Sequence, residues 1–178
     1  MYPVVPQGKD PNVKDILAVA FAAKGNDLIV GNKSGELRVI TNGAVRRILT
    51  GHTSQIEQIK FNHAGKFMAT SSKDRSMRLW NFADLNQQPQ VLNDHDWVWS
   101  MAFSPDDNQI MAGIHSIVQG IRAEDVDYTI HVWPTKISAM SGKLCGYVKK
   151  NLSKSDWDQF VQDDNYQSTC PNLPANNK

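Results

Sequence analysis

One stretch of the chain, residues 51–80, holds residue types that could act together on a substrate. His52, Thr70 and Asp74 supply an imidazole, a hydroxyl and a carboxylate, the groups that make up a hydrolytic triad. Such a triad also needs hydrogen-bond donors for the oxyanion that forms in the reaction, and no loop typical of an oxyanion hole accompanies these residues. We therefore predict no catalytic residue, and a hydrolase that uses His52 and Asp74 is kept only as an alternative.

The segments around these residues repeat along the chain. Three segments carry apolar side chains at their first, fourth and sixth positions, and each ends in a phenylalanine that a turn follows. These phenylalanines, Phe21, Phe61 and Phe103, are separated by 40 and then 42 residues. Apolar runs bounded by Gly, Asn, Asp and Ser predict strands joined by hairpins. The spacing is typical of the four-stranded blades of a propeller.

The unit from residue 51 to residue 80 resembles a WD repeat, which forms one blade of a β-propeller. In such repeats a His, a Ser or Thr, an Asp and a Trp form a hydrogen-bonded set, and the matching residues here are His52, Thr70, Asp74 and Trp80. The imidazole can donate to the Asp and accept from the Thr hydroxyl, whose oxygen can accept from the indole N–H. The resemblance therefore implies a buried structural set that fixes the outer turns of the blade.

The predicted fold class is all-β, a partial WD40 propeller of three recognisable four-stranded antiparallel blades with a short helical tail at the C-terminus. The expected boundaries are an irregular lead-in at 1–14, blades at 15–50, 51–93 and 94–140, and a tail at 141–178.

The flanking blades depart from the polar pattern of the second. The first blade lacks the polar set, so apolar packing must hold it. In the third blade His95, Asp127 and Trp133 match the set, but Ala112 takes the position of the hydroxyl residue.

The third repeat also predicts a long loop. Thr70 and Trp80 are 10 residues apart, whereas Ala112 and Trp133 are 21 apart, which places about eleven extra residues near 116–124. Blade topology puts this loop on the same face as the His-bearing turns, and loops on a rigid scaffold concentrate binding residues. A tolerated surface insertion is the alternative. The candidate partner-binding face consists of Lys73, Arg75, Asp96, Trp97, Gln119 and Arg122.

Composition is that of an ordinary soluble domain. The chain has 178 residues, a formal net charge of +1, 21% charged and 40% hydrophobic residues, which gives no general attraction to nucleic acid or to an anionic membrane. The sequence shows neither an apolar run long enough to span a membrane nor a secretory signal. A cytoplasmic protein without a cofactor is expected, and its partner is another protein or a peptide.

Histidine and cysteine spacing predicts no metal centre. None of the five histidines has the close partner spacing of a metal site. The two cysteines are too few for a disulfide framework. Reduced thiols are therefore expected, and a single Cys145–Cys170 bridge is the alternative.

The tail is predicted to be helical and irregular. Residues 137–140 are expected to form a last short strand, and residues 143–151 a helix with apolar positions at i, i+3 and i+4. Ser153 has the spacing of a capping residue for a second helix.

The tail also resembles the segment that ends WD-repeat regions in large bacterial proteins. Those regions often follow a STAND-type signalling NTPase or a caspase-like peptidase, and no phosphate-binding loop or peptidase signature lies in this chain. The residues that carry this resemblance are Leu144, Cys145, Trp157, Tyr166, Cys170 and Pro171.

These patterns together predict a non-catalytic scaffold or sensor module for protein–protein interaction, the C-terminal part of a larger propeller. The alternative is the regulatory sensor region of a bacterial signalling NTPase or caspase-like peptidase. Propellers close with about 4–8 blades, so three blades leave bare flanks, and self-association through exposed blade edges is predicted.

Overall fold

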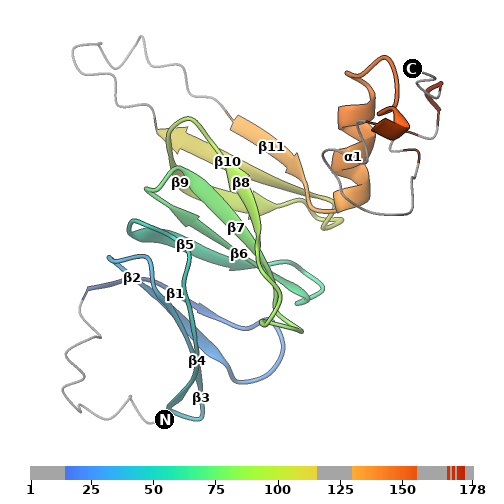
Figure 1. Ribbon diagram of the computed structural model, residues 1–178. Helices are drawn as coiled ribbons and strands as arrows, with labels where there is room; N and C mark the ends of the chain where they lie inside the picture. The colour runs from blue at the N-terminus through green and yellow to red at the C-terminus, as the bar shows by residue number, and fades with distance from the viewer. Residues whose placement is uncertain (1–14, 116–129, 156–167, 169, 171, 175–178) are drawn as a thin grey trace, which may run out of the picture. The chain divides into compact units, whose positions relative to one another are not determined.

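The computed structural model describes residues 15–115, 130–155, 168, 170 and 172–174. The described strands form two four-stranded antiparallel sheets and one three-stranded sheet (Figure 1). These three sheets correspond to the three predicted blades, and the all-β fold class with one short helix is confirmed. Each is called a blade below, in chain order.

The strands follow one another in simple order within each blade. The first blade contains β1 (Ile16–Phe21), β2 (Leu28–Asn32), β3 (Leu37–Thr41) and β4 (Ala44–Leu49). The second contains β5 (Ile56–Phe61), β6 (Phe67–Ser72), β7 (Ser76–Asn81) and β8 (Gln90–Asn93). The third contains β9 (Trp97–Phe103), β10 (Gln109–His115) and β11 (Ile130–Pro134).

The blades pack through their first strands, because β1 contacts β5 and β5 contacts β9. Between the first two blades the backbone of β2 comes close to Ile56, and a Cβ built on Gly31 would lie 2.8 Å from the Ile56 Cγ2 atom. Phe61 and Phe82 add an edge-to-face contact with ring centroids 4.8 Å apart. A side chain at Gly31 would therefore separate the two blades. The apolar core between them contains Ala18, Ala22, Ile29, Leu37, Val39, Leu49, Ile56, Ile59, Met68 and Trp80.

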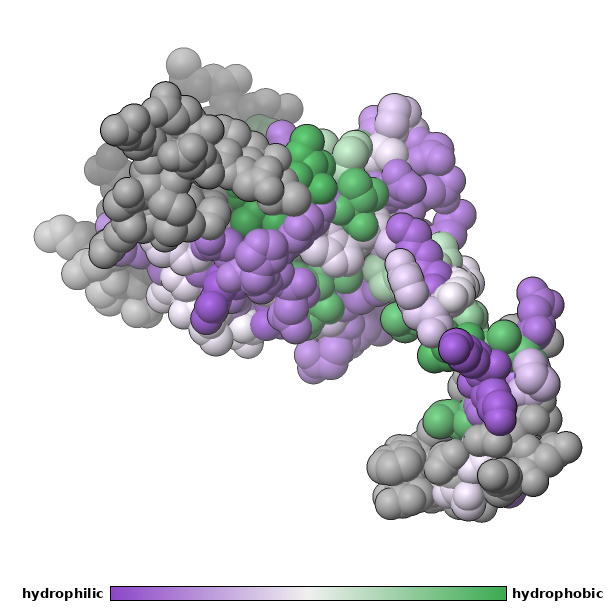
Figure 2. Space-filling view, turned by 90° about the horizontal axis from the view of Figure 1, so that it is seen from above, coloured by the Kyte–Doolittle hydropathy of each residue, from purple (hydrophilic) through white to green (hydrophobic). Residues whose placement is uncertain are grey.

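The first strand also presents apolar side chains to solvent. Alternate residues of β1 point to opposite faces of the sheet, and Ala18 is buried whereas Leu17, Val19 and Phe21 are 48%, 62% and 71% exposed. Hydrophobic side chains are visible beside hydrophilic ones on the molecular surface (Figure 2). The first blade thus has one face packed against the second blade and one face whose apolar side chains on β1 are exposed.

A second compact unit begins at Pro134. Its helix α1 (Ile137–Cys145) includes residues 137–140, so the short strand predicted there is wrong. The helix also ends earlier than the predicted 143–151 segment. Gly146 stands at its C-cap, with its N–H bonded to the carbonyl groups of Lys143 and Leu144. The expected apolar stripe does not pack, because Tyr147 is 87% exposed.

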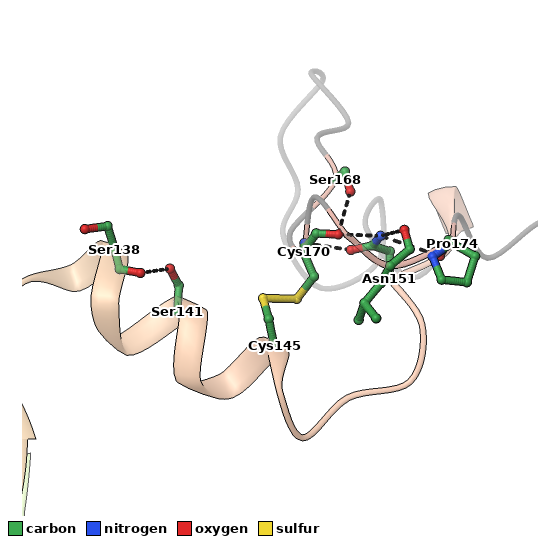
Figure 3. The surroundings of a disulfide bond; sticks show 8 residues. Ser138, Ser141, Cys145, Asn151, Ser168, Cys170 and Pro174 are labelled. Atoms are coloured by element: carbon green, nitrogen blue, oxygen red, sulfur yellow. Dashed lines mark hydrogen bonds between the residues drawn. A yellow bond between two sulfur atoms is a disulfide. The ribbon is translucent and has the colours of Figure 1, made fainter.

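The second unit is cross-linked. Cys145 and Cys170 form a disulfide with a Cα–Cα distance of 5.5 Å (Figure 3), so the expectation of reduced thiols does not hold for this structure and the alternative bridge is present. The buried Asn151 side chain donates to the Cys170 and Leu173 carbonyl oxygens at 3.0 and 2.8 Å. It also accepts from the Cys170 N–H at 2.7 Å. The Asn151 side-chain amide thus provides hydrogen bonds to backbone groups that lie outside the helices and sheets.

Only the start of the predicted second helix falls within the described residues, at positions 154 and 155. Among the described residues, no helix has the length and apolar character needed to cross a membrane.

Candidate functional site

The polar residues of the second blade form one connected hydrogen-bond chain. His52 precedes β5, Thr70 lies on β6 and Trp80 lies on β7. The His52 Nδ1 atom is 2.7 Å from the Asp74 carboxylate, and its Nε2 atom is 2.8 Å from the Thr70 hydroxyl. The Trp80 indole N–H donates to the same hydroxyl at 3.0 Å. The structure therefore brings together all four residues that the resemblance selects.

Asp74 is the most heavily bonded member of this set. Burial raises the pKa of its carboxyl, but hydrogen bonds from His52 and Ser76, the His52 charge and the Thr53 N–H outweigh burial and hold that pKa well below 3.8. The Ser76 hydroxyl and N–H both donate to Oδ1, at 2.7 and 2.9 Å. The ionised carboxylate thus closes the β6–β7 turn and links it to the loop before β5.

Two serines of this turn were not predicted as part of the set. Ser76 bonds to Asp74, and the Ser72 hydroxyl accepts from the Asp74 N–H at 3.1 Å while donating to the Ser54 carbonyl at 3.0 Å. The signal for them is local. Short hydroxyl residues two positions on either side of an Asp are the residues that form Asx and related turns.

Burial of the set decides between structural and catalytic chemistry. Thr70 is 0% exposed and the His52 side chain is also 0% exposed. The hydroxyl that a triad would use as nucleophile is shared between the imidazole and the indole, so a substrate has no access to it. The geometry supports a structural role and gives no support to hydrolysis through His52 and Asp74.

The first blade closes the equivalent turn with a different residue. Val30 pairs with Val19 where Thr70 pairs with Ile59, so no hydroxyl is present. The Asn32 side-chain oxygen accepts from the Ser34 N–H at 3.0 Å and from the Glu36 N–H at 2.9 Å. One amide oxygen therefore replaces the carboxylate of the second blade.

The third blade does not assemble the predicted set. The repeat pattern places His95 in the buried polar set of this blade. Its side chain is instead 68% exposed, and its Nδ1 atom lies 3.0 Å from the Asp94 carboxylate. Ala112 is fully buried and offers the ring no hydroxyl, which is the physical reason for the difference. Trp133 makes an edge contact with His131, with ring centroids 5.5 Å apart. Asp127 lies outside the described residues.

Asp94 instead joins two histidines from different segments. The His131 Nδ1 atom lies 2.8 Å from the second oxygen of the Asp94 carboxylate, and the Asp94 side chain is 0% exposed. The His95 and His131 rings are 5.2 Å apart. Sequence spacing could not reveal this cluster, because 37 residues separate Asp94 from His131.

Part of the predicted partner-binding face comes together around Lys73. Its ammonium group lies 4.8 Å from the Trp97 ring centroid and 5.1 Å from the Trp99 centroid, and 3.8 Å from the Glu57 carboxylate. Trp99, which was not among the predicted residues of this face, is 41% exposed. The ammonium group of Lys73 thus lies over both tryptophan rings, a geometry that favours cation–π attraction.

The other predicted residues of this face divide into two groups. Arg75 is exposed at the tip of the β6–β7 turn, and the half-buried Asp96 accepts from the Trp97 N–H at 2.7 Å. Gln119 and Arg122 lie outside the described residues. The described face therefore consists of Lys73, Arg75, Asp96, Trp97 and Trp99, which are called the loop face below.

A further polar junction, absent from the sequence predictions, connects the second and third blades. The Asp107 carboxylate accepts from the Asn62 amide and from the His63 and Ala64 N–H groups, each at 2.9 Å. Burial raises the pKa of Asp107, but the bonds from His63 and Ala64 together outweigh it and lower that pKa. One carboxylate thus holds the turn of the neighbouring blade.

A family comparison matches these features. The model of the family described as "WD domain, G-beta repeat" matches residues 43–81 and 86–134, which contain the second blade and the described strands of the third. The chain belongs to the WD-repeat family. Such proteins are typically non-catalytic scaffolds, in agreement with the buried polar set described above.

Curated relatives support the same assignment. The chain is 30% identical over 105 residues to "WD repeat-containing protein 26 homolog" of Arabidopsis thaliana, covering 57% of this chain and 17% of the relative. It is 26% identical to "Protein tipD" of Dictyostelium discoideum over 57% of this chain and 15% of the relative. It is 30% identical to human "WD repeat and SOCS box-containing protein 1" over 47% of this chain and 21% of the relative.

The chain therefore spans about a fifth or less of the length of these relatives.

Proposed function

We propose that this protein is a non-catalytic interaction module that binds another protein or a peptide through the loop face. The observation that supports this most directly is the placement of the Lys73 ammonium over Trp97 and Trp99, beside the exposed Arg75. Tryptophan and arginine are the residues most often responsible for binding energy at protein interfaces.

The side chain of Lys73 and the turn that carries it are already held in place before a partner binds. Lys73 is confined by two rings and by Glu57, and the turn that carries it is closed by the Asp74 bonds to Ser76. A side chain that is already ordered loses less conformational entropy when a partner arrives. We infer a partner segment that offers a carboxylate to Arg75 and an apolar side chain to the tryptophan pair.

The test compares binding partners of matched variants. The untagged wild-type chain and the variants Trp97→Ala and Arg75→Glu are immobilised, and the proteins that bind to each are identified. The affinity of each identified protein is then measured by surface plasmon resonance. A true partner binds the wild type and loses at least tenfold in affinity with both variants.

Lys66 provides the control, because its ammonium also lies over an aromatic ring, 5.6 Å from the Phe67 centroid, but in a different turn of the second blade. Lys66→Ala should keep full affinity. If partners bind the loop-face variants as tightly as the wild type, the loop face is not the binding surface.

The finer predictions from the sequence stay proposals. A role as sensor region of a bacterial signalling NTPase or caspase-like peptidase rests on the tail resemblance alone, and the relatives reported above are eukaryotic. The absence of nucleic-acid and membrane partners rests on the net charge of +1. A cytoplasmic location rests on composition, and the Cys145–Cys170 disulfide weighs against it, because reducing compartments keep thiols reduced.

A further inference from the structure

We propose that Asp94, His95 and His131 form a binding site for one divalent transition metal ion of the zinc type. Each residue offers one ligand atom, and these atoms all lie within 4.8 Å of one another. Two imidazoles and one carboxylate are ligands that zinc accepts in proteins, usually with a fourth position for another ligand or water. The site is specific to the third blade.

The carboxylate at the centre of this cluster is anchored. The Asp94 side chain is 0% exposed, and its backbone N–H donates to the Arg75 carbonyl at 2.8 Å. Each carboxylate oxygen faces a different imidazole, His95 at 3.0 Å and His131 at 2.8 Å. Among the described residues, the ion pairs of Asp94 are with these two histidines, groups that are charged only when protonated. A bound cation would therefore compensate a buried carboxylate.

Comparison with the second blade shows that the cluster replaces an ordinary structural contact. Gly51 and Asp94 each precede a histidine before the first strand of a blade, and Arg78 and His131 each stand two residues before a tryptophan. In the second blade Arg78 donates to the Gly51 carbonyl at 2.8 Å. A Cβ built on Gly51 would lie 2.6 Å from the Arg78 Nη1 atom. Asp94 carries a carboxylate at the position of Gly51, so an arginine at the position of Arg78 would leave no room for it. The third blade has the shorter imidazole of His131 there.

The second histidine is available because its structural partner is missing. His52 is held inside the second blade by the Thr70 hydroxyl, whereas Ala112 leaves His95 without one. The His95 ring lies 68% exposed beside Asp94. Its side chain can therefore rotate toward a metal ion without breaking the core.

The required movement is small. Zinc ligand atoms lie about 2.0–2.2 Å from the ion, so two ligand atoms of a tetrahedral site are about 3.4 Å apart. The widest separation in the cluster, 4.8 Å, needs to shorten by roughly 1.4 Å. Movement of the exposed His95 ring can supply this. The nitrogens that coordinate the ion must be free of protons.

The experiment measures zinc binding to the untagged, full-length chain under non-reducing conditions. Both cysteines of the sequence are in the disulfide and do not compete for the ion. Isothermal titration with ZnCl₂ should give one saturable site per chain. Cobalt(II) titration should give visible absorption bands typical of tetrahedral nitrogen and oxygen coordination.

Three variants decide the assignment. His95→Ala and His131→Ala should each weaken zinc binding at least tenfold. His63→Ala is the matched control, because His63 also pairs with a carboxylate and is 65% exposed, and this variant should bind like the wild type. Thermal melts without zinc establish that each variant is folded. The exposed position of His95 keeps the test decisive if His131→Ala fails to fold.

Absence of saturable binding by the wild type would overturn the proposal and leave a hydrogen-bonded trio without a ligand. Unchanged affinity in His95→Ala, or an equal loss in His63→Ala, would also overturn it.

Discussion

At the scale of single residues, His52 connects two buried partners. Its removal takes one hydrogen bond from the Asp74 carboxylate and one from the Thr70 hydroxyl, which are 2.7 and 2.8 Å long, and losing the partner of a buried polar group costs about 1–3 kcal/mol. We expect His52→Ala to lower the free energy of unfolding by roughly that amount per group in urea titration. His63→Ala, which changes an exposed ring, should shift the midpoint far less. Equal midpoints for the two variants would contradict the buried set.

The same substitution in the third blade should cost less. The His95 ring is 68% exposed, and Ala112 already lacks the hydroxyl that a structural set requires. We expect His95→Ala to reduce unfolding free energy by less than half the loss at His52→Ala. Both variants are compared in metal-free buffer, so that zinc binding does not enter the measurement. A larger loss at His95 would show that its pairing with Asp94 is the stronger structural contact.

Asp74 predicts a pH dependence with a definite sign. Its folded-state pKa is lowered below 3.8, against the raising effect of burial, by the bonds from His52 and Ser76. The stability it contributes is therefore fully present above pH 3.8 and is lost as the pH falls toward the folded-state pKa. The stability difference between the wild type and Asp74→Asn should shrink between pH 5 and pH 2 in urea titrations. A difference that stays constant over this range would contradict ionisation of Asp74 as the cause.

The site residues that could be predicted from the sequence are those that occupy fixed positions of the repeat. His52, Thr70, Asp74 and Trp80 occupy repeat positions, so their meeting follows from strand order alone. Asp107 instead bonds to the neighbouring blade, through the Asn62 side chain and the His63 backbone N–H. The Asp94 cluster depends on a substitution of one blade and on pairing across 37 residues. Contacts of this kind follow from three-dimensional packing and leave no periodic signal.

At the scale of elements, the disulfide and Asn151 organise the second unit. The bridge closes a loop with a sequence separation of 25, and closing a loop of that length stabilises by about 3–4 kcal/mol in the chain-entropy model. We expect Cys145→Ser/Cys170→Ser to speed hydrogen exchange at the Cys170 N–H, which Asn151 holds at 2.7 Å. Exchange within β5–β8 should not change. Intact mass spectrometry with and without reductant checks the bridge itself, and a chain that keeps two free thiols under oxidising conditions would contradict it.

Element boundaries were predictable where turn chemistry was strong. Asn42 and Gly43 have φ angles of 50° and 81°, the left-handed conformation that a two-residue hairpin needs, and the strands on both sides follow the predicted pattern. The tail lacked such a constraint. Its apolar spacing favoured a helix at 143–151, but the helix ends at Cys145 and Gly146 stands at its C-cap. Apolar periodicity alone did not locate this boundary.

At the scale of the whole molecule, the repeat predicts an array with open ends. The first blade leaves an apolar row on β1, and the last described strand of the third, β11, leaves Ile130 67% and Val132 41% exposed. In a closed propeller each blade covers its neighbour. Burial of apolar area stabilises by about 25 cal/mol per Å², so two copies that cover these faces gain stability that one copy lacks.

We therefore expect the 178-residue chain to self-associate in a concentration-dependent way, measured by light scattering coupled to gel filtration. Val19→Lys/Phe21→Lys places two charges on the apolar row of β1, where both side chains are more than half exposed, and should shift the population toward monomer. Tyr147→Lys, at an 87% exposed position of the second unit, should leave association unchanged. A wild-type chain that stays monomeric at the highest concentrations would show that its own segments cover the open face of the first blade, because an uncovered apolar row of this kind favours association.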